Sequence, residues 1–236
     1  SPIPNPQYTK YLSLYVSSNF NIKIYFKLYY IIMDQNNKYD FLPSKLDKIS
    51  FRITANDDRK KISSENCSSL PYSAIGLLKV IFNHNTVSYR TGVLIGKNIV
   101  LTAGHNLYDS RKNPNKPDEP LGSPISIEFY PGLTENSNKF GKCEFKKFFY
   151  PKNFNKDGKE DYGIIILKED IGDKTGYLDL KIFEEEDNNH IFYNIGYPLN
   201  KTTDNNKVFY LYESSGTLDY ADIEKGVIIS GIKSSY

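Results

Sequence analysis

Short runs of β-branched, aliphatic and aromatic residues, separated by polar turn signals, dominate the chain from Ala74 onward. Side chains of this kind favour strands, and no apolar period typical of a useful length of helix competes with them. The turns include 96–98 and the Pro-, Asn- and Lys-rich stretch 110–120, which we expect to be a loop. Many short strands joined by polar turns predict an all-β sandwich or barrel. The predicted strands are 74–82, 89–94, 99–101, 125–129, 144–150, 163–167, 191–195, 208–212 and 226–232.

Length and charge narrow the classes of protein further. The 236 residues suffice for one large all-β domain or for two small β-barrels that share an interface. The 30 Lys and Arg against 28 Asp and Glu leave a formal charge of +2, so no global field would recruit nucleic acid or an anionic membrane. The apolar stretch 8–32 is interrupted by Lys23 and Lys27. We therefore expect no nucleic-acid partner and no transmembrane span.

The chain has two cysteines, Cys67 and Cys143, and no Cys/His spacing of a zinc site. Because nothing in the sequence identifies an oxidising compartment, we predict that the two thiols are not bridged. We also expect no metal ion and no cofactor.

The beginning of the sequence leaves the localisation open. The first residue is Ser1 and the only methionine is Met33, so either the N-terminus is truncated or translation starts at Met33. No stretch has the form of a convincing secretory signal peptide. Asn66 and Asn200 begin glycosylation sequons, but such matches arise easily by chance in an Asn-rich chain.

The most informative stretch for function is 91–105, where two apolar runs flank a Gly-Lys-Asn turn and a histidine follows Thr-Ala-Gly. A lone histidine is more often an ordinary surface residue than a functional one, but this motif is long and specific. It resembles the histidine motif of the trypsin-like serine peptidases. The resemblance implies that His105 is a general base, a role that suits an imidazole because its ordinary pKa of about 6.5 lies near neutrality. His84 and His190 are expected to be solvated surface side chains.

A second motif supplies a carboxylate. Asp161 stands directly before the apolar run 163–167, with Tyr162 between them. An aspartate before a strand is often only a turn residue. This motif, however, resembles the aspartate motif of the same family and follows His105 in the family's order. The resemblance implies that Asp161 fixes the tautomer of the imidazole and stabilises the imidazolium. We therefore predict that the carboxylate of Asp161 lies within hydrogen-bonding distance of the His105 nitrogen that does not face solvent.

Two later motifs, Gly196-Tyr197-Pro198 and Glu213-Ser-Ser-Gly216, resemble signposts of the glutamyl endopeptidase branch of that family. As structure alone, the first is a turn and the second a strand segment. In the family the nucleophile motif Gly-x-Ser-Gly follows closely. None occurs here, because Ser230, Ser234 and Ser235 are not followed by the glycine and proline of that turn. We expect the motif within about ten residues after Tyr236.

The resemblance implies an all-β fold with a double six-stranded β-barrel, chymotrypsin-like, whose second barrel is incomplete. The implied division is an N-terminal extension, 1–66, an N-terminal barrel with His105 and Asp161, 67–175, and a partial C-terminal barrel, 176–236. The implied function is a serine endopeptidase that works through a Ser-His-Asp triad and an acyl-enzyme, with the serine missing from this sequence. Its partner would be a polypeptide substrate, the protein would be a monomer, and the family analogy would make it secreted.

Two alternatives remain open. One is a non-catalytic homologue of the proteases that keeps the barrels as a protein-binding module, which applies if the downstream sequence lacks the serine. The other is a β-sandwich interaction protein in which His105 and Asp161 do not meet. The distance between these two side chains separates the second alternative from a triad.

Overall fold

The computed structural model describes about three fifths of the chain in several stretches and is all-β with short helical turns. No helix in these stretches is long and apolar enough to cross a membrane. The described residues are 15–17, 23–26, 59–83, 86–113, 116–135, 137–151, 161–182, 192–201, 208–216, 218–222 and 227–230.

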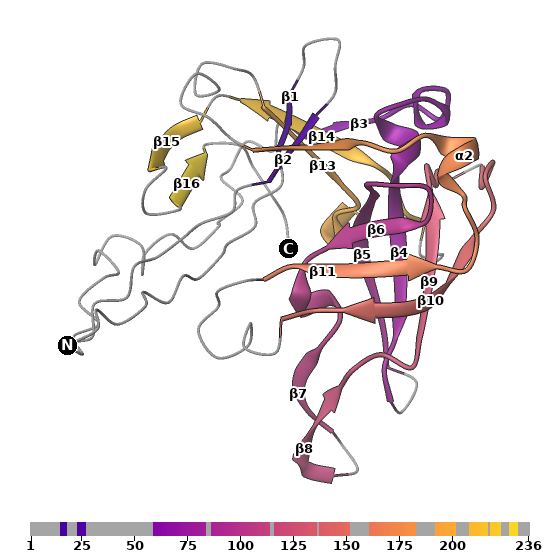
Figure 1. The fold of residues 1–236 in the computed structure, drawn as a ribbon, viewed down its shortest axis with the longest axis vertical. Helices are drawn as coiled ribbons and strands as arrows, with labels where there is room; N and C mark the ends of the chain where they lie inside the picture. Colours follow the sequence, from indigo (N-terminus) through magenta and orange to yellow (C-terminus); the bar gives the residue numbers. More distant parts are fainter. Residues whose placement is uncertain are drawn as a thin grey trace, which may run out of the picture.

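Six antiparallel strands form a closed barrel, in the order β10-β11-β6-β5-β4-β9, and β9 closes it by pairing with β10 (Figure 1). Closure removes free strand edges, and the side chains of a small barrel fill its interior. The sequence-predicted strands over these six segments are confirmed to within a few residues. The strands are β4 (Ile75–Ile81), β5 (Val87–Leu94), β6 (Ile99–Thr102), β9 (Ser126–Pro131), β10 (Cys143–Phe149) and β11 (Gly163–Leu167).

The barrel core follows from the alternation of side chains along the strands. In β11, Gly163, Ile165 and Leu167 are buried while Ile164 and Ile166 are only partly so. Buried side chains from the other strands meet them inside the barrel. The largest fully buried ones in the barrel strands and the adjoining segments are Leu78, Phe82, Leu94, Leu107, Ile127 and Phe129.

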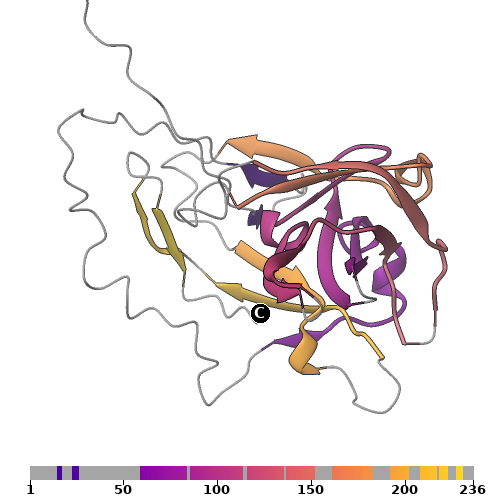
Figure 2. The same ribbon diagram turned by 90° about the horizontal axis from the view of Figure 1, so that it is seen from below.

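A second, six-stranded sheet lies beside the barrel, in the order β12-β2-β1-β13-β14-β3 (Figures 1 and 2). Its strands come from both ends of the chain, since β1 to β3 precede the barrel and β12 to β14 follow it. The predicted second barrel is not closed in the described residues and stays a prediction. The strands are β1 (Tyr15–Ser17), β2 (Lys23–Phe26), β3 (Lys60–Lys61), β12 (Asp179–Ile182), β13 (Phe192–Gly196) and β14 (Tyr212–Gly216).

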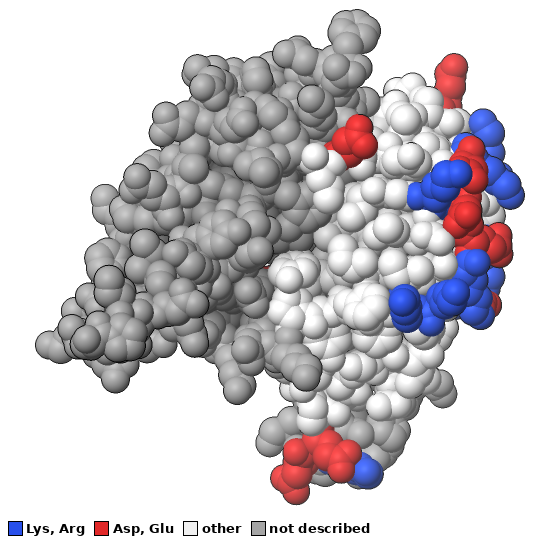
Figure 3. Space-filling model, in the orientation of Figure 1, with Lys and Arg blue, Asp and Glu red and all other residues white. Residues whose placement is uncertain are grey.

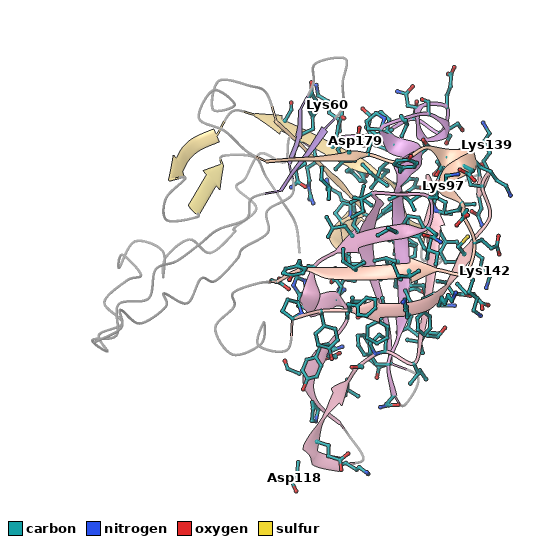
Figure 4. All side chains as sticks on the ribbon, viewed as in Figure 1. Lys60, Lys97, Asp118, Lys139, Lys142 and Asp179 are labelled. Atoms are coloured by element: carbon teal, nitrogen blue, oxygen red, sulfur yellow. The ribbon has the colours of Figure 1, made fainter. Side chains whose placement is uncertain are left out.

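Two hairpins stand apart from these sheets: β7 (Asp109–Asn113) with β8 (Lys116–Gly122), and β15 (Leu218–Asp222) with β16 (Val227–Ser230). The first projects from the barrel, and Asp118 lies at its tip (Figure 4). The prediction of a loop over 110–120 is therefore wrong.

A two-stranded sheet explains that difference, because each strand has an open edge and tolerates the prolines that a central strand would not. At the base of this hairpin the Asp109 carboxylate accepts hydrogen bonds from the Arg111 side chain and from its backbone N–H, the latter at 2.9 Å. The turn-like composition of 110–120 thus gives a hairpin with a locally braced base.

The predicted strand over 208–212 is also largely wrong, since β14 begins only at Tyr212, opposite Gly196. Phe209 and Leu211 are buried at 8% and 1% exposure without belonging to a strand. Phe209 packs its ring 4.5 Å from that of Tyr89 on the barrel. Burial rather than membership of a continuous strand accounts for this apolar run, although Leu211 O still accepts a backbone hydrogen bond from Ile62 at 2.9 Å.

The remaining elements are short. In the part of the chain that the structure describes, one helical turn, α2, follows β11, and four 3₁₀ turns cap or connect strands. Their bounds are η2 (Asn66–Ser68), η3 (Tyr72–Ala74), η5 (Gly104–Asn106), α2 (Gly172–Thr175) and η7 (Leu199–Lys201).

Charged side chains gather on one flank of the barrel, beside β9, β10 and α2, while much of the adjoining described surface in the same view is uncharged (Figure 3). Lys142 lies on this flank (Figure 4) and contacts Glu128, which also accepts hydrogen bonds from Lys79 at 3.0 Å and from Tyr130 at 2.9 Å. Burial alone would raise the pKa of the Glu128 carboxyl, but these donors outweigh it and lower the pKa to about 2.

Cys67 and Cys143, which we predicted to be unbridged, are buried free thiols. Burial raises the pKa of each thiol to about 11. Neither thiol is therefore ionised to a useful extent near neutrality, which is typical of structural cysteines.

Candidate active site

His105 lies in the single turn η5, directly after β6 ends at Thr102. The turn is closed by the backbone N–H of Leu107, which donates to Gly104 O at 2.8 Å. A Cβ at Gly104 would stand 3.0 Å from Tyr162 O and 3.2 Å from Asp161 Oδ1. Glycine at this position therefore lets the turn approach the residues before β11 closely, which explains the small residue before the histidine.

Asp161 reaches the same place through strand pairing. β11 runs antiparallel to β6 with Gly163 opposite Thr102, so the residues just before β11 lie beside the residues just after β6. His105 Nδ1 lies 2.6 Å from Asp161 Oδ2, and the backbone N–H of His105 donates to Asp161 Oδ1 at 2.8 Å. The predicted contact is present, and both carboxylate oxygens take part in it.

The electrostatics favour an ionised Asp161. Burial by itself would raise the pKa of this carboxyl. The hydrogen bond from the His105 ring, the charge of that ring, and the backbone N–H groups of His105 and Gly104 together outweigh burial and lower the pKa below its usual range. The carboxylate therefore stays charged and accepts the Nδ1 proton, which leaves Nε2 as the ring nitrogen whose lone pair can accept a proton.

Both side chains remain partly open, with 43% of the His105 side chain and 37% of the Asp161 side chain exposed. A buried pair would be cut off from any reacting group, whereas this one lies at the surface of the barrel. The contact excludes the alternative in which the two residues do not meet, and the catalytic roles of His105 and Asp161 remain predictions.

The other residues singled out in the sequence are placed differently. His84, His190, Ser234 and Ser235 lie outside the described residues. Ser230 ends β16, and only its backbone is described.

Sequence reasoning missed three polar residues around the histidine. Asn106, 7% exposed, donates from Nδ2 to Thr102 Oγ1 at 2.8 Å, and Thr102 Oγ1 donates to Thr91 O at the same distance. All three belong to the histidine motif or follow it directly. Their polar character in an otherwise apolar stretch was the available signal.

The two signposts of the later sequence have structural roles. The backbone N–H of Tyr197 donates to Thr91 Oγ1 at 2.9 Å, and its hydroxyl donates to Leu133 O at 2.9 Å. Tyr72, in η3, donates its hydroxyl to Glu213 Oε2 at 2.7 Å. Both signposts thus contact the barrel or the segment that leads into it.

Among the described residues, no group of three or more His, Cys, Asp and Glu side chains is arranged to hold a metal ion.

Sequence comparison relates the chain to two bacterial enzymes, although no family model matches it. It is 27% identical over 137 residues to a glutamyl endopeptidase from Bacillus licheniformis, a stretch that is 58% of this chain and 39% of that protein. It is 30% identical over 128 residues to a protein named extracellular metalloprotease from Bacillus subtilis, which is 53% of this chain and 37% of that protein. The chain thus matches less than half the length of either relative.

Among solved structures, a Glu endopeptidase in complex with MPD superposes with a TM-score of 0.55 at 23% identity, covering 75% of this chain and 79% of that one. This likeness bears on the fold and supports an all-β, chymotrypsin-like architecture. Together with the sequence similarity, it confirms the resemblance to the trypsin-like serine peptidases of the glutamyl endopeptidase kind.

Proposed function

We propose that this chain is part of a serine endopeptidase and contributes the histidine and the aspartate of a Ser-His-Asp triad. The observation that carries the proposal is the double contact of Asp161, one oxygen on His105 Nδ1 and the other on the His105 backbone N–H. A triad needs this arrangement, because the carboxylate must hold the ring in one tautomer and one orientation. The similarity to a glutamyl endopeptidase supports the same reading.

In the proposed reaction, His105 Nε2 takes the proton of a serine hydroxyl while the serine oxygen attacks the carbonyl carbon of the scissile peptide bond. The resulting imidazolium is stabilised by the Asp161 carboxylate and then gives its proton to the leaving amine as the C–N bond breaks. Water, deprotonated by the same nitrogen, hydrolyses the acyl-enzyme and releases the carboxylic acid and the serine.

We propose that the serine lies in sequence that follows Tyr236, since no Gly-x-Ser-Gly motif occurs in the printed chain. The division of the chain into an extension (1–66), a barrel with the histidine and aspartate (67–175) and part of a second barrel (176–236) is also a proposal. The closed barrel over 75–167 supports the middle part of this division. The strands β1, β2 and β3 pair with strands after residue 178, so parts of the proposed extension belong to the same sheet as the proposed second barrel.

The test is to read the gene beyond the codon for Tyr236 and to express the longer product. The name of the Bacillus licheniformis relative makes peptides that contain glutamate the first substrates to assay. We expect hydrolysis that falls by about 10⁴-fold in kcat in the Asp161→Asn variant, which keeps the shape but favours the wrong imidazole tautomer. His105→Ala should abolish activity to near background.

His190→Ala is the control, since it removes a histidine to which we assign no role. Hydrolysis that survives His105→Ala would refute His105 as the base. A gene that ends at Tyr236, or that carries another residue in place of the serine, would refute the enzyme for this product and leave a protein-binding homologue in its place.

A further inference from the structure

The turn that carries His105 is short, and the histidine is its exposed residue. It is a single 3₁₀ turn, and the His105 side chain is nearly half exposed, so packing alone does not hold the imidazole. The next residue differs in this respect, because Asn106 is buried. What holds Asn106 therefore also holds the turn.

Asn106 is tied to the end of β6. Its Nδ2 donates to Thr102 Oγ1 at 2.8 Å, four residues back. Thr102 pairs with Gly163, and Gly163 follows Asp161 by two positions in the sequence. This hydrogen bond therefore links the turn that carries the histidine to the strand pair that carries the aspartate.

Thr102 in turn is tied to β5. Strands β5 and β6 pair at Val93 with Leu101. At the next residue of β6, the Thr102 side chain donates a hydrogen bond from Oγ1 to Thr91 O on β5 at 2.8 Å. A hydroxyl can accept one hydrogen bond and donate another, which is how Thr102 serves both neighbours.

Thr91 carries the connection to the second sheet. Its Oγ1 accepts from the backbone N–H of Tyr197, the residue directly after β13. Gly196 provides the space, since a Cβ there would stand 3.0 Å from Thr91 Oγ1. Tyr197 is itself fixed, with 4% exposure and a hydroxyl that donates to Leu133 O.

We propose that Asn106, Thr102 and Thr91 are positioning residues, which fix the His105 imidazole relative to Asp161 and to the second sheet. The catalytic meaning of this inference rests on the proposed function. The proposed serine follows the strands of the second sheet in sequence, and its hydroxyl must lie within hydrogen-bonding distance of the imidazole. Sequence separations of 4, 11 and 106 residues are bridged in three steps. Neighbouring hydrogen bonds of this kind strengthen one another, so the loss of one link should loosen the others.

The test uses the printed chain and needs no activity. We expect the proton on His105 Nδ1, which is hydrogen-bonded to Asp161, to give a separate low-field NMR signal whose rate of exchange with water reports how often the pair opens. Thr102→Val keeps the side-chain shape and removes both hydrogen bonds of the middle link. We expect exchange to accelerate by about fivefold or more, the factor expected for the loss of one hydrogen bond.

A matched series separates positioning from general stability. Thr91→Val should accelerate exchange in the same direction, and Thr91→Ser, which keeps the hydroxyl, should restore the wild-type rate. Thr175→Val is the control, because it makes the same change at a buried threonine that ends α2 and whose hydroxyl donates to the backbone oxygen of the next residue, Gly176. It should lower global stability without changing the Nδ1 proton.

Unchanged exchange in folded Thr102→Val and Thr91→Val would overturn the inference and leave the proposed triad intact. If Thr102→Val does not fold, the Thr91→Val and Thr91→Ser pair decides by the same criterion. Absence of the Nδ1 signal in the unmodified chain at low temperature would instead count against the His105–Asp161 pair and the proposed function. In the longer, active product, Thr91→Val should lower kcat and leave KM nearly unchanged.

Discussion

The barrel and the second sheet use different means to stay folded. Each barrel strand has two paired neighbours, and the core between them includes side chains at or near zero exposure, such as Leu78, Val100 and Ile165. The described part of the second sheet is open, and it meets the barrel through particular contacts such as those of Tyr197 and Phe209. The barrel therefore holds His105 and Asp161 on a scaffold that is complete in itself, while the second sheet depends on that scaffold for its place.

Truncating one phenylalanine in each region should show the largest difference. Phe129 has 0% exposure in the barrel core, and Phe209 has 8% where the second sheet meets the barrel. We expect Phe129→Ala to lower the free energy of unfolding by about 3–5 kcal/mol, since it leaves a cavity that a closed barrel cannot collapse to fill. Phe209→Ala should cost clearly less. Urea unfolding measures both, and an equal or larger loss at Phe209 would refute the comparison.

Adding a methyl group tests the same packing from the other side. At Gly76 a Cβ would lie 2.3 Å from a carbon of the Phe129 ring, whereas at Gly141 it would meet nothing within 4 Å. Gly76→Ala should destabilise by about 2–3 kcal/mol, because the buried ring has nowhere to move. Gly141 has a φ of +74°, so Gly141→Ala carries only the backbone cost of about 1 kcal/mol. Thermal and urea unfolding should rank them in that order.

Removing one hydroxyl addresses the joint between the regions. Tyr72→Phe deletes the hydrogen bond to Glu213 on β14, and we expect a loss of about 1 kcal/mol in stability. Hydrogen exchange should show faster opening of β13 and β14 amides, with barrel amides unchanged. Tyr130→Phe is the matched control, because its hydroxyl also donates to a carboxylate but within the barrel. If Tyr72→Phe accelerates amide exchange equally in the second sheet and in the barrel, the contact between Tyr72 and Glu213 does not act locally on the second sheet.

The smallest effect concerns the charged flank of the barrel. The pKa of Glu128 is about 2 in the folded protein, below its ordinary value of 4.5, so its contribution to stability is present above about pH 5 and is lost as the pH falls through 2. Between pH 5 and pH 2, the free energy of unfolding of the natural protein should therefore fall by about 1 kcal/mol more than that of the Glu128→Gln variant. The difference is modest because Lys79 and Lys142 are partly exposed. Urea unfolding at each pH measures this difference, and an equal loss of stability in the two proteins would contradict the lowered pKa of Glu128.

Local pattern accounts for much of what could be predicted. The barrel strands were visible as short apolar runs because the alternation of side chains in a strand is a property of neighbouring residues. The histidine and aspartate motifs were visible because each is a compact stretch with its own turn or strand. The hairpin over 109–122 was missed because its proline-rich composition is that of a loop, and only pairing with a second open-edged strand makes it a hairpin.

By itself, then, the sequence determined the strands of the barrel, the identity of the histidine and aspartate, and the small residues that allow them to approach. The tertiary structure decided which residues contact one another around the site. Thr91 accepts a hydrogen bond from Tyr197, Thr102 accepts one from Asn106, and the two carboxylate oxygens of Asp161 contact the ring and the backbone N–H of His105. Strand identity is encoded within a few residues. These contacts depend on the register of β6 against β11 and on the docking of the second sheet, which join residues 56 and 106 positions apart, and no local pattern carries that information.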